Sequence, residues 1–172
     1  MSGASVHNLT AAMDRLKLLP GGRSNPLSRR IDALSAGTER GFRASDGRFD
    51  QDKLGPLWVV FEERQDNVYW RPQTGEVATL HGRAFALGES LIEDAATYSL
   101  DGVLHINSTI EGWLLDKYRS IYVIDWSQAF DKLRNAPRVG LDHDFQEIYH
   151  QHMRPARMPK VYVRRENAQD HA

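Results

Sequence analysis

The chain has 172 residues, of which 41% are hydrophobic, and this is enough to bury the core of one domain. It contains no cysteine, which excludes disulfides, thiolate metal sites and a nucleophilic thiol. No apolar run approaches the ~18 residues that span a bilayer, and the first residues lack the pattern of a secretory signal. The sequence therefore predicts a soluble, cytoplasmic protein without a membrane partner.

The net charge of −1 conceals an uneven distribution of charge along the chain. Basic residues outnumber acidic residues by 9 to 6 in residues 1–53 and by 5 to 2 in residues 150–172, whereas acidic residues prevail by 15 to 8 in residues 54–149. The basic ends could contact a polyanion, or they could neutralise the acidic centre. Both a nucleic-acid partner and a protein partner are consistent with this pattern.

Residues 1–53 are predicted to form a helical arm followed by a polar linker. Apolar side chains have helical spacing over residues 6–19, and Pro26 stands at the first position of a second short helix. Residues 38–53 are polar, contain glycine and show no period, so we expect a loop. Its phenylalanines lie beside arginines; they could stack on nucleobases, or they could fix the loop to the body.

Residues 54–165 are predicted to form a single α/β domain, whose first part, residues 54–101, is an antiparallel meander followed by a helix. The period changes to two at Leu57, which indicates strands, and turn residues separate three of them, over 57–61, 68–70 and 76–80. The meander aromatics could form a stacking platform or pack beneath a helix. A helix is expected over residues 90–98.

Strands and helices alternate in residues 102–165, which predicts a four-stranded, mostly parallel βαβαβαβ half. The fold class is therefore α/β in this half and α+β overall. A polar tail, residues 166–172, follows. The expected strands are 103–106, 121–124, 138–141 and 160–164, and the expected helices begin after Ser108, after Ser127 and at Phe145.

An acidic pair, Asp142 and Asp144, follows the third of these strands, and Asp125 follows the second. Because ligands of open α/β sheets collect beyond the carboxyl ends of strands, we expect the three carboxylates to share one edge. They could hold Mg²⁺, the only cofactor that the sequence suggests. The alternative is structural: Asp144 could cap the next helix, with Glu147 as its reciprocal partner.

With this order of elements, the C-terminal half resembles a Toprim domain, the metal-binding module of primases, topoisomerases and related nucleases. In that family a Glu ends the first strand and an Asp-x-Asp pair ends a later strand, and together they hold magnesium for phosphoryl transfer. Here Asp142-His143-Asp144 matches the pair, but Asn107 ends the first strand, and Glu111 lies a turn into the helix. The resemblance implies a degenerate copy, so no catalytic residue is assigned.

A basic run near the C-terminus is the predicted nucleic-acid contact: Arg154, Arg157, Lys160, Arg164 and Arg165. The alternative is an edge strand that its charges protect against aggregation. Two functions follow: a nucleic-acid-associated accessory protein of a mobile element or replication system, or a phage- or plasmid-type inhibitor or adaptor that binds a protein through its acidic surface. An enzyme with Mg²⁺-dependent phosphoryl transfer ranks below both, and the oligomeric state is left undetermined.

Overall fold

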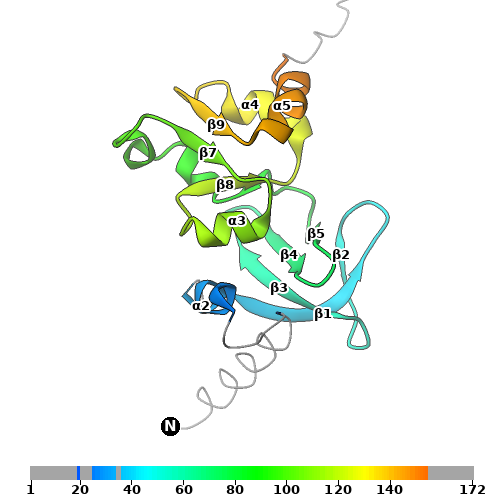
Figure 1. Cartoon of the computed structure of the whole chain (residues 1–172). Coiled ribbons are helices and arrows are strands. Elements are labelled where there is room, and N and C mark those ends of the chain that lie inside the picture. The colour runs from blue at the N-terminus through cyan, green and yellow to red at the C-terminus, as the bar shows by residue number, and fades with distance from the viewer. Residues whose placement is uncertain (1–18, 20–24, 34–35, 155–172) are drawn as a thin grey trace, which may run out of the picture.

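The computed structural model describes residues 19, 25–33 and 36–154 (Figure 1). The helix expected over residues 6–19, apart from its last residue, the strand expected over 160–164 and the tail lie outside the described residues. Two sheets, each with its own topology, make up the described part. The mixture of helices and strands confirms the α+β class.

The first sheet is antiparallel and has five strands in the order β2-β1-β3-β4-β5. The predicted three-stranded meander forms its β3, β4 and β5, at the expected positions. Short continuous runs of large apolar residues explain this agreement for β3 and β4, because both faces of these strands are buried. The strands are β1 (Gly37–Arg43), β2 (Phe49–Gln51), β3 (Leu57–Glu62), β4 (Asn67–Arg71) and β5 (Glu76–Thr79).

The predicted linker over residues 38–53 is wrong, because this stretch forms the β1–β2 hairpin. Most of its side chains are exposed, so the strands lack the apolar alternation that signals a buried face. Gly41 allows the hairpin to pack closely, since a Cβ there would lie only 2.2 Å from the Asp50 carbonyl oxygen. The first sheet therefore crosses the domain boundary expected at residue 53.

The first sheet curls until its two edges meet (Figure 1). Arg48, next to β2, forms a bridge with Thr79 of β5, and the Arg43 guanidinium donates to the Val77 carbonyl oxygen at 2.9 Å. The result is a small, nearly closed barrel. Its interior is a cluster of mostly aromatic side chains, in which Phe49 stacks on Tyr69 at 3.7 Å: Phe49, Trp58, Val60, Tyr69 and Ala78.

The second sheet has four strands in the order β6-β8-β7-β9. The three predicted strands pair in parallel, whereas the fourth, β6, was not predicted and pairs antiparallel with β8. Among the described residues the sheet is therefore mixed, and its antiparallel strand β6 precedes the parallel strands in the sequence. The strands are β6 (Ala86–Leu87), β7 (Leu104–Ile106), β8 (Ser120–Val123) and β9 (Val139–Leu141).

The helices that connect the parallel strands lie on opposite faces of the second sheet. The chain passes from β7 to β8 in one direction along the sheet and from β8 back to β9 in the other, so right-handed crossovers place the connecting helices on opposite faces. Accordingly, α3 joins the core with the barrel, whereas α4 and α5 cover the other face (Figure 1). The helices are α2 (Pro26–Ala33), α3 (Ile110–Leu115), α4 (Ala129–Leu133) and α5 (Gln146–His152).

The helix expected over residues 90–98 is wrong. Two short 3₁₀ turns occupy this stretch, η2 (Glu89–Ile92) and η3 (Ala95–Tyr98), and the Asp94 side chain caps the second by accepting from the Ala96 amide. Neither turn contains a fully buried residue, and Leu91, Ile92 and Tyr98 pack on the core only in part, so little apolar burial stabilises a longer helix.

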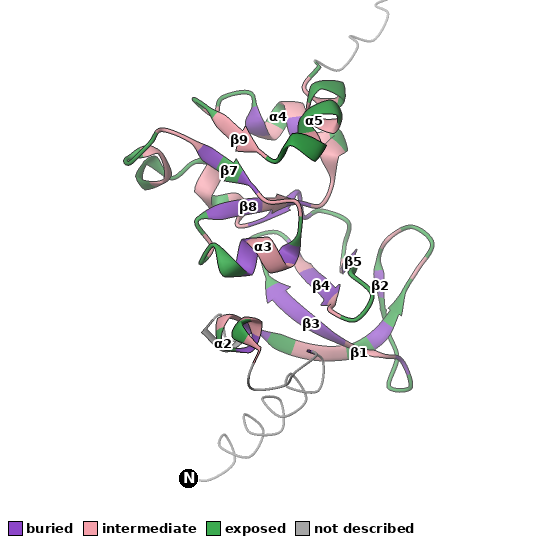
Figure 2. Cartoon of the chain, viewed as in Figure 1, coloured by how far each residue is buried: buried purple, intermediate pink, exposed green. Residues whose placement is uncertain are grey.

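One core joins the barrel to the second sheet (Figure 2). Trp70 and Phe61 of the barrel pack in the same cluster as Ile31 of α2 and Trp113 of α3. The meander aromatics do not form an exposed platform, since Trp58, Tyr69 and Trp70 are each no more than 2% exposed. Trp70 packs with the helices as expected, whereas Trp58 and Tyr69 fill the barrel interior. No helix among the described residues has the length and apolarity needed to cross a bilayer.

Two acidic side chains hold the segment between the sheets. Asp66 is buried and accepts from the amides of Asn67, His81 and Arg83 at 2.7–3.1 Å. Glu63 accepts from the Gly88 amide at 2.7 Å, and burial raises its pKa above the ordinary value. Because His81, Arg83 and Gly88 lie outside the strands, these carboxylates satisfy backbone donors that no sheet pairs, and they fix the path of the chain around β6.

Candidate binding site at the strand ends of the second sheet

The carboxyl ends of β7 and β9 meet at a topological switch point. The two strands are neighbours, and Ile106 pairs with Leu141, so Asn107 and Asp142 are the next residues of each strand. After β7 the chain leaves towards α3, and after β9 it leaves towards α5, which packs on the opposite face. In open α/β sheets, ligands bind in the crevice that this divergence creates.

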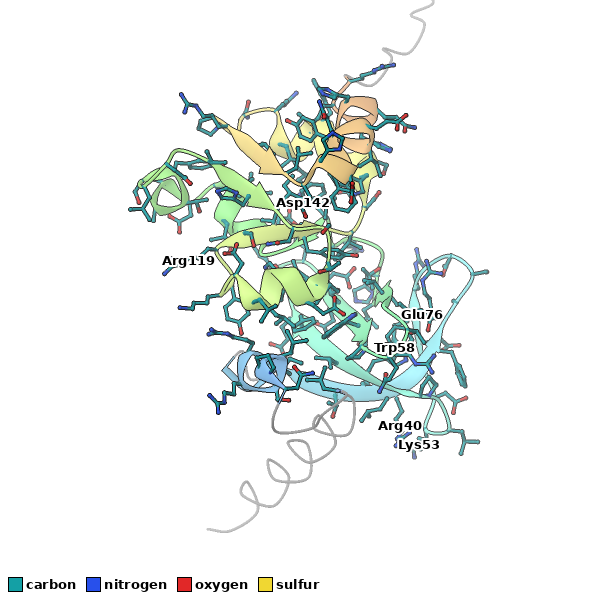
Figure 3. All side chains as sticks on the ribbon, in the orientation of Figure 1. Arg40, Lys53, Trp58, Glu76, Arg119 and Asp142 are labelled. Carbon is teal, nitrogen blue, oxygen red and sulfur yellow. The ribbon has the colours of Figure 1, made fainter. Side chains whose placement is uncertain are left out.

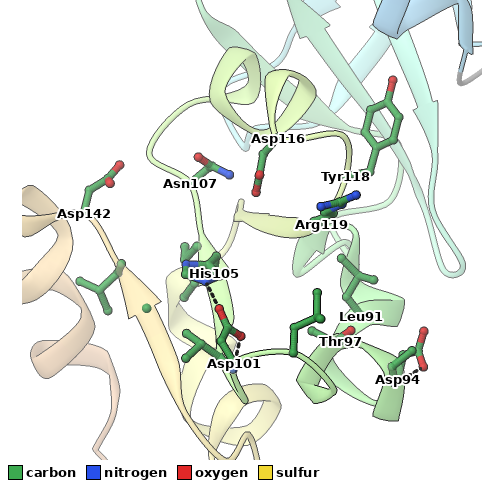
Figure 4. Close-up of a pocket in the computed structure, with 16 residues that line it drawn as sticks. Leu91, Asp94, Thr97, Asp101, His105, Asn107, Asp116, Tyr118, Arg119 and Asp142 are labelled. Carbon is green, nitrogen blue, oxygen red and sulfur yellow. Dashed lines mark hydrogen bonds and ion pairs between the residues drawn. The ribbon is translucent and has the colours of Figure 1, made fainter.

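A cavity of about 1070 Å³ opens at this switch point and extends over one face of β7 and β9 (Figure 4). Its walls come from the segment that contains η3 and from the loop between α3 and β8. Leu91 and Leu141 contribute apolar surface. Its charged and titratable lining is predominantly acidic: Asp94, Asp101, Asp116 and Asp142, against Arg119 and His105.

His105 lies at the centre of the cavity floor, on β7, which is flanked by β8 and β9. Its Nε2 lies 3.2 Å from Asp101 Oδ2, and the side chain is 54% exposed (Figure 4). The Val103 amide and the imidazole together lower the pKa of Asp101. Gly140 leaves room for this imidazole, since a Cβ at that position would lie 3.1 Å from His105 Nδ1.

The loop after α3 supplies the opposite wall. Two consecutive residues, Lys117 and Tyr118, have left-handed backbones, with φ of 58° and 62°. This conformation is unfavourable for residues other than glycine, and here the Tyr118 hydroxyl donates to the Arg30 carbonyl oxygen while its ring packs on Trp113. The anchored Tyr118 and its neighbour Arg119 both line the cavity (Figure 4).

Asp125, the first predicted metal ligand, serves as a helix cap. Its carboxylate accepts from the amide and hydroxyl of Ser127 and from the Gln128 side chain, at 2.6–3.0 Å. Burial alone would raise its pKa, but these hydrogen bonds outweigh burial and lower it. Ser127, the cap expected from the sequence, therefore donates to Asp125, which occupies the N-cap position. In the same way Thr109, not Ser108, caps α3 by accepting from the Gly112 amide.

Asp144 does not act as the predicted helix cap. A 3₁₀ turn, η5 (His143–Phe145), precedes α5, so the N-cap position of α5 falls on Phe145, and Asp144 lies inside the turn. Within the described part of the chain, neither Asp142 nor Phe145 makes a side-chain cap hydrogen bond. The capping box between Asp144 and Glu147 is therefore wrong, because the turn shifts the start of the helix.

The three predicted ligands are not brought together. Strand β7 lies between β8 and β9, so Asp125 and Asp142 end strands that are two spacings apart, about 10 Å. Among residues 19, 25–33 and 36–154, no three His, Asp or Glu side chains form a group that could hold a metal ion. The expected carboxylate cluster is therefore absent from this part of the molecule.

The position that the Toprim resemblance assigns to a glutamate does not fit Mg²⁺ either. The Asn107 amide donates to the hydroxyl of Ser120, a fully buried residue, so this side chain fastens β7 to β8. An amide held in this way cannot replace the missing carboxylate as a charged ligand. The described ends of β7 and β9 therefore place one carboxylate, that of Asp142, beside a neutral amide, that of Asn107.

Of the predicted nucleic-acid contacts, the structure describes Arg154, which is exposed just after α5. The other four, from Arg157 to Arg165, lie outside the described residues. Figure 3 shows Arg119 and Asp142 in the half that carries the second sheet, whereas Arg40 and Lys53 belong to the barrel.

No protein-family model matches the chain, and no curated protein or solved structure shows significant similarity to it. The resemblance to a Toprim domain therefore stays a prediction.

Sequence reasoning missed most of the cavity lining. His105 carried a signal: a polar residue stands between Leu104 and Ile106 in an otherwise apolar strand, which is unexpected for a strand buried on both faces. Asp101, Asp116 and Arg119 lie in loops that only the fold brings to the same cavity, and their sequence context shows no motif.

Proposed function

We propose that the chain is a non-catalytic accessory protein of a nucleic-acid-processing system, such as a mobile element or a replication system. The observation that supports this proposal best is the pairing of strand ends at the switch point. Asn107 stands beside Asp142 where the Toprim resemblance implies a glutamate beside an aspartate. In this proposal a Toprim-like framework carries the neutral amide of Asn107 at the position of the glutamate.

In this proposal the basic C-terminal residues contact phosphates, while acidic residues prevail in the preceding stretch, residues 54–149. Five phosphate contacts on duplex DNA would reduce affinity about 500-fold between 50 and 200 mM salt. The test is fluorescence anisotropy with labelled single- and double-stranded 20-mers at these two salt concentrations. Binding that is absent, or that salt does not weaken, contradicts the proposal.

A matched pair of full-length variants locates the contact. The first replaces four predicted contacts by alanine: Arg157, Lys160, Arg164 and Arg165. The second removes the same charge elsewhere, at four residues described in the structure: Arg29, Arg64, Arg134 and Arg138. We expect the first variant to reduce the salt slope by about four contacts and the second to change it by less than one.

A second candidate function is supported by the acidic cavity. Four aspartates line it, against one arginine and one histidine, so its charge opposes a phosphate and favours a cation. This charge balance fits a protein-binding inhibitor or adaptor that meets a basic partner surface.

A further inference from the structure

The face of the second sheet above His105 is open in the part of the chain that the structure describes. Parallel strands normally have both faces covered, since each face carries apolar side chains. Here α4 and α5 cover one face. On the other face α3 and the barrel pack against Tyr122 of β8, whereas the side chain of His105 on the neighbouring strand β7 is 54% exposed. A sheet with this topology has a place for another layer.

We infer that the cavity over this face binds an extended, arginine- or lysine-bearing segment of a partner protein. This inference deepens the second candidate function, because it assigns the protein contact to one site and one ligand chemistry. The cavity volume of about 1070 Å³ lies at the upper end of small-molecule pockets, which favours a peptide segment over a single small ligand.

Charge and shape at the cavity agree with a basic side chain that has an apolar stem. Asp101, Asp116 and Asp142 contribute carboxylates from three different elements, and guanidinium groups bind carboxylates with two parallel hydrogen bonds. Leu100 stands at the same cavity with 93% of its surface exposed. The methylene stem of an arginine or lysine could cover this leucine while its charged group reaches the aspartates.

Gly140 determines the depth of the cavity floor. A Cβ at this position would lie 2.9 Å from Val103 Cγ1 and 3.1 Å from His105 Nδ1, so the imidazole would have to move away from β9. Gly140→Ala therefore changes the shape of the site without changing its charge.

The test measures the anisotropy of a fluorescein-labelled octapeptide in which arginine alternates with serine, with the full chain at low salt. The cavity variant combines Asp101→Asn, Asp116→Asn and Asp142→Asn. The control variant, Asp50→Asn, Asp131→Asn and Glu147→Gln, neutralises three exposed acids that do not line the cavity. We expect the cavity variant to weaken binding at least about tenfold and the control to weaken it less than about twofold.

Further measurements distinguish a basic peptide from other ligands that could occupy the cavity. A peptide in which glutamate replaces arginine should not bind, and Gly140→Ala should weaken binding of the arginine peptide. Equal losses in the cavity and control variants, or no saturable binding, overturn the inference. So does tighter peptide binding when Arg157, Lys160, Arg164 and Arg165 are replaced by serine, because the chain's own basic end would then be the occupant.

The inference and the second candidate function can fail separately. A stoichiometric partner that binds the wild type and the cavity variant equally supports an adaptor and excludes the cavity as its site. The nucleic-acid proposal is tested by its own salt titration and does not depend on the result.

Discussion

Replacing Asp66 by alanine should destabilise the fold clearly more than replacing Asp52, whose side chain accepts a single amide in an exposed turn. The carboxylate is 5% exposed and accepts from three backbone amides, of Asn67, His81 and Arg83. Hydrogen bonds to a charged group contribute about 1.5–3 kcal/mol each. His81 and Arg83 are themselves exposed, so water can satisfy part of what is lost. We therefore expect a loss of about 3 kcal/mol rather than the full sum.

The measurement is urea unfolding, followed by tryptophan fluorescence and circular dichroism. For a chain of this size, the loss corresponds to a fall in Tm of about 6–12 °C. Asp52→Ala is the control, because Asp52 accepts one amide, that of Leu54, in an exposed turn. It should lose less than about 1 kcal/mol. If both variants lose the same amount, or if Asp66→Ala stays within about 0.5 kcal/mol of the wild type, Asp66 does not anchor this segment.

Three other substitutions test the barrel, the junction and the capping of the second half. Gly41→Ala should lower the free energy of unfolding by about 3 kcal/mol, because its Cβ would overlap the hairpin backbone. Gly75→Ala, where φ is 73° and no atom lies within 4 Å of the added Cβ, should lower it by about 1 kcal/mol. Equal Tm shifts in the two variants would contradict the close approach at Gly41. Burial raises the pKa of Glu63, so its folded state favours the protonated form, and stability is lost as pH rises above the ordinary glutamate value of 4.5. Glu63→Gln mimics that form and should raise the Tm at pH 7 but not at pH 4; a lower Tm at pH 7 would refute this. Asp125→Ala should lower the free energy of unfolding by about 1 kcal/mol at pH 7. The difference in stability between wild type and variant should shrink in acid, because the lowered pKa of Asp125 confines the contribution of its carboxylate to higher pH. A difference that does not depend on pH would argue against the cap.

Local patterns were sufficient where a strand or helix carries its own signal. The strands around Val59, Tyr69 and Ile121 were predicted because large apolar residues alternate or run together there, and the structure buries them. The helix that begins at Pro26 also has a local signal, since proline fits the first helical turn. Helix starts were less predictable, because Asp125 and Thr109 took the capping roles expected of neighbouring serines.

The β1–β2 hairpin shows where local patterns fail. Its residues are mostly exposed and charged, so their sequence looks like a loop, and strand formation depends on partners far along the chain. Arg43 reaches the carbonyl of Val77, and Phe49 stacks on Tyr69. Such contacts have no signature in the hairpin itself.

The candidate site divides in the same way. The sequence alone predicts an α+β fold, parallel strands in the C-terminal half and a carboxylate at the end of one of these strands. Only the tertiary structure decided which strand ends are neighbours. The return of the chain across β7 separates Asp125 from Asp142, sets Asn107 beside Asp142 and brings Asp101, Asp116 and Arg119 to one cavity. The physical reason is that side-chain periodicity reports which face of a strand is buried, whereas strand order depends on crossover direction and on packing between segments distant in sequence.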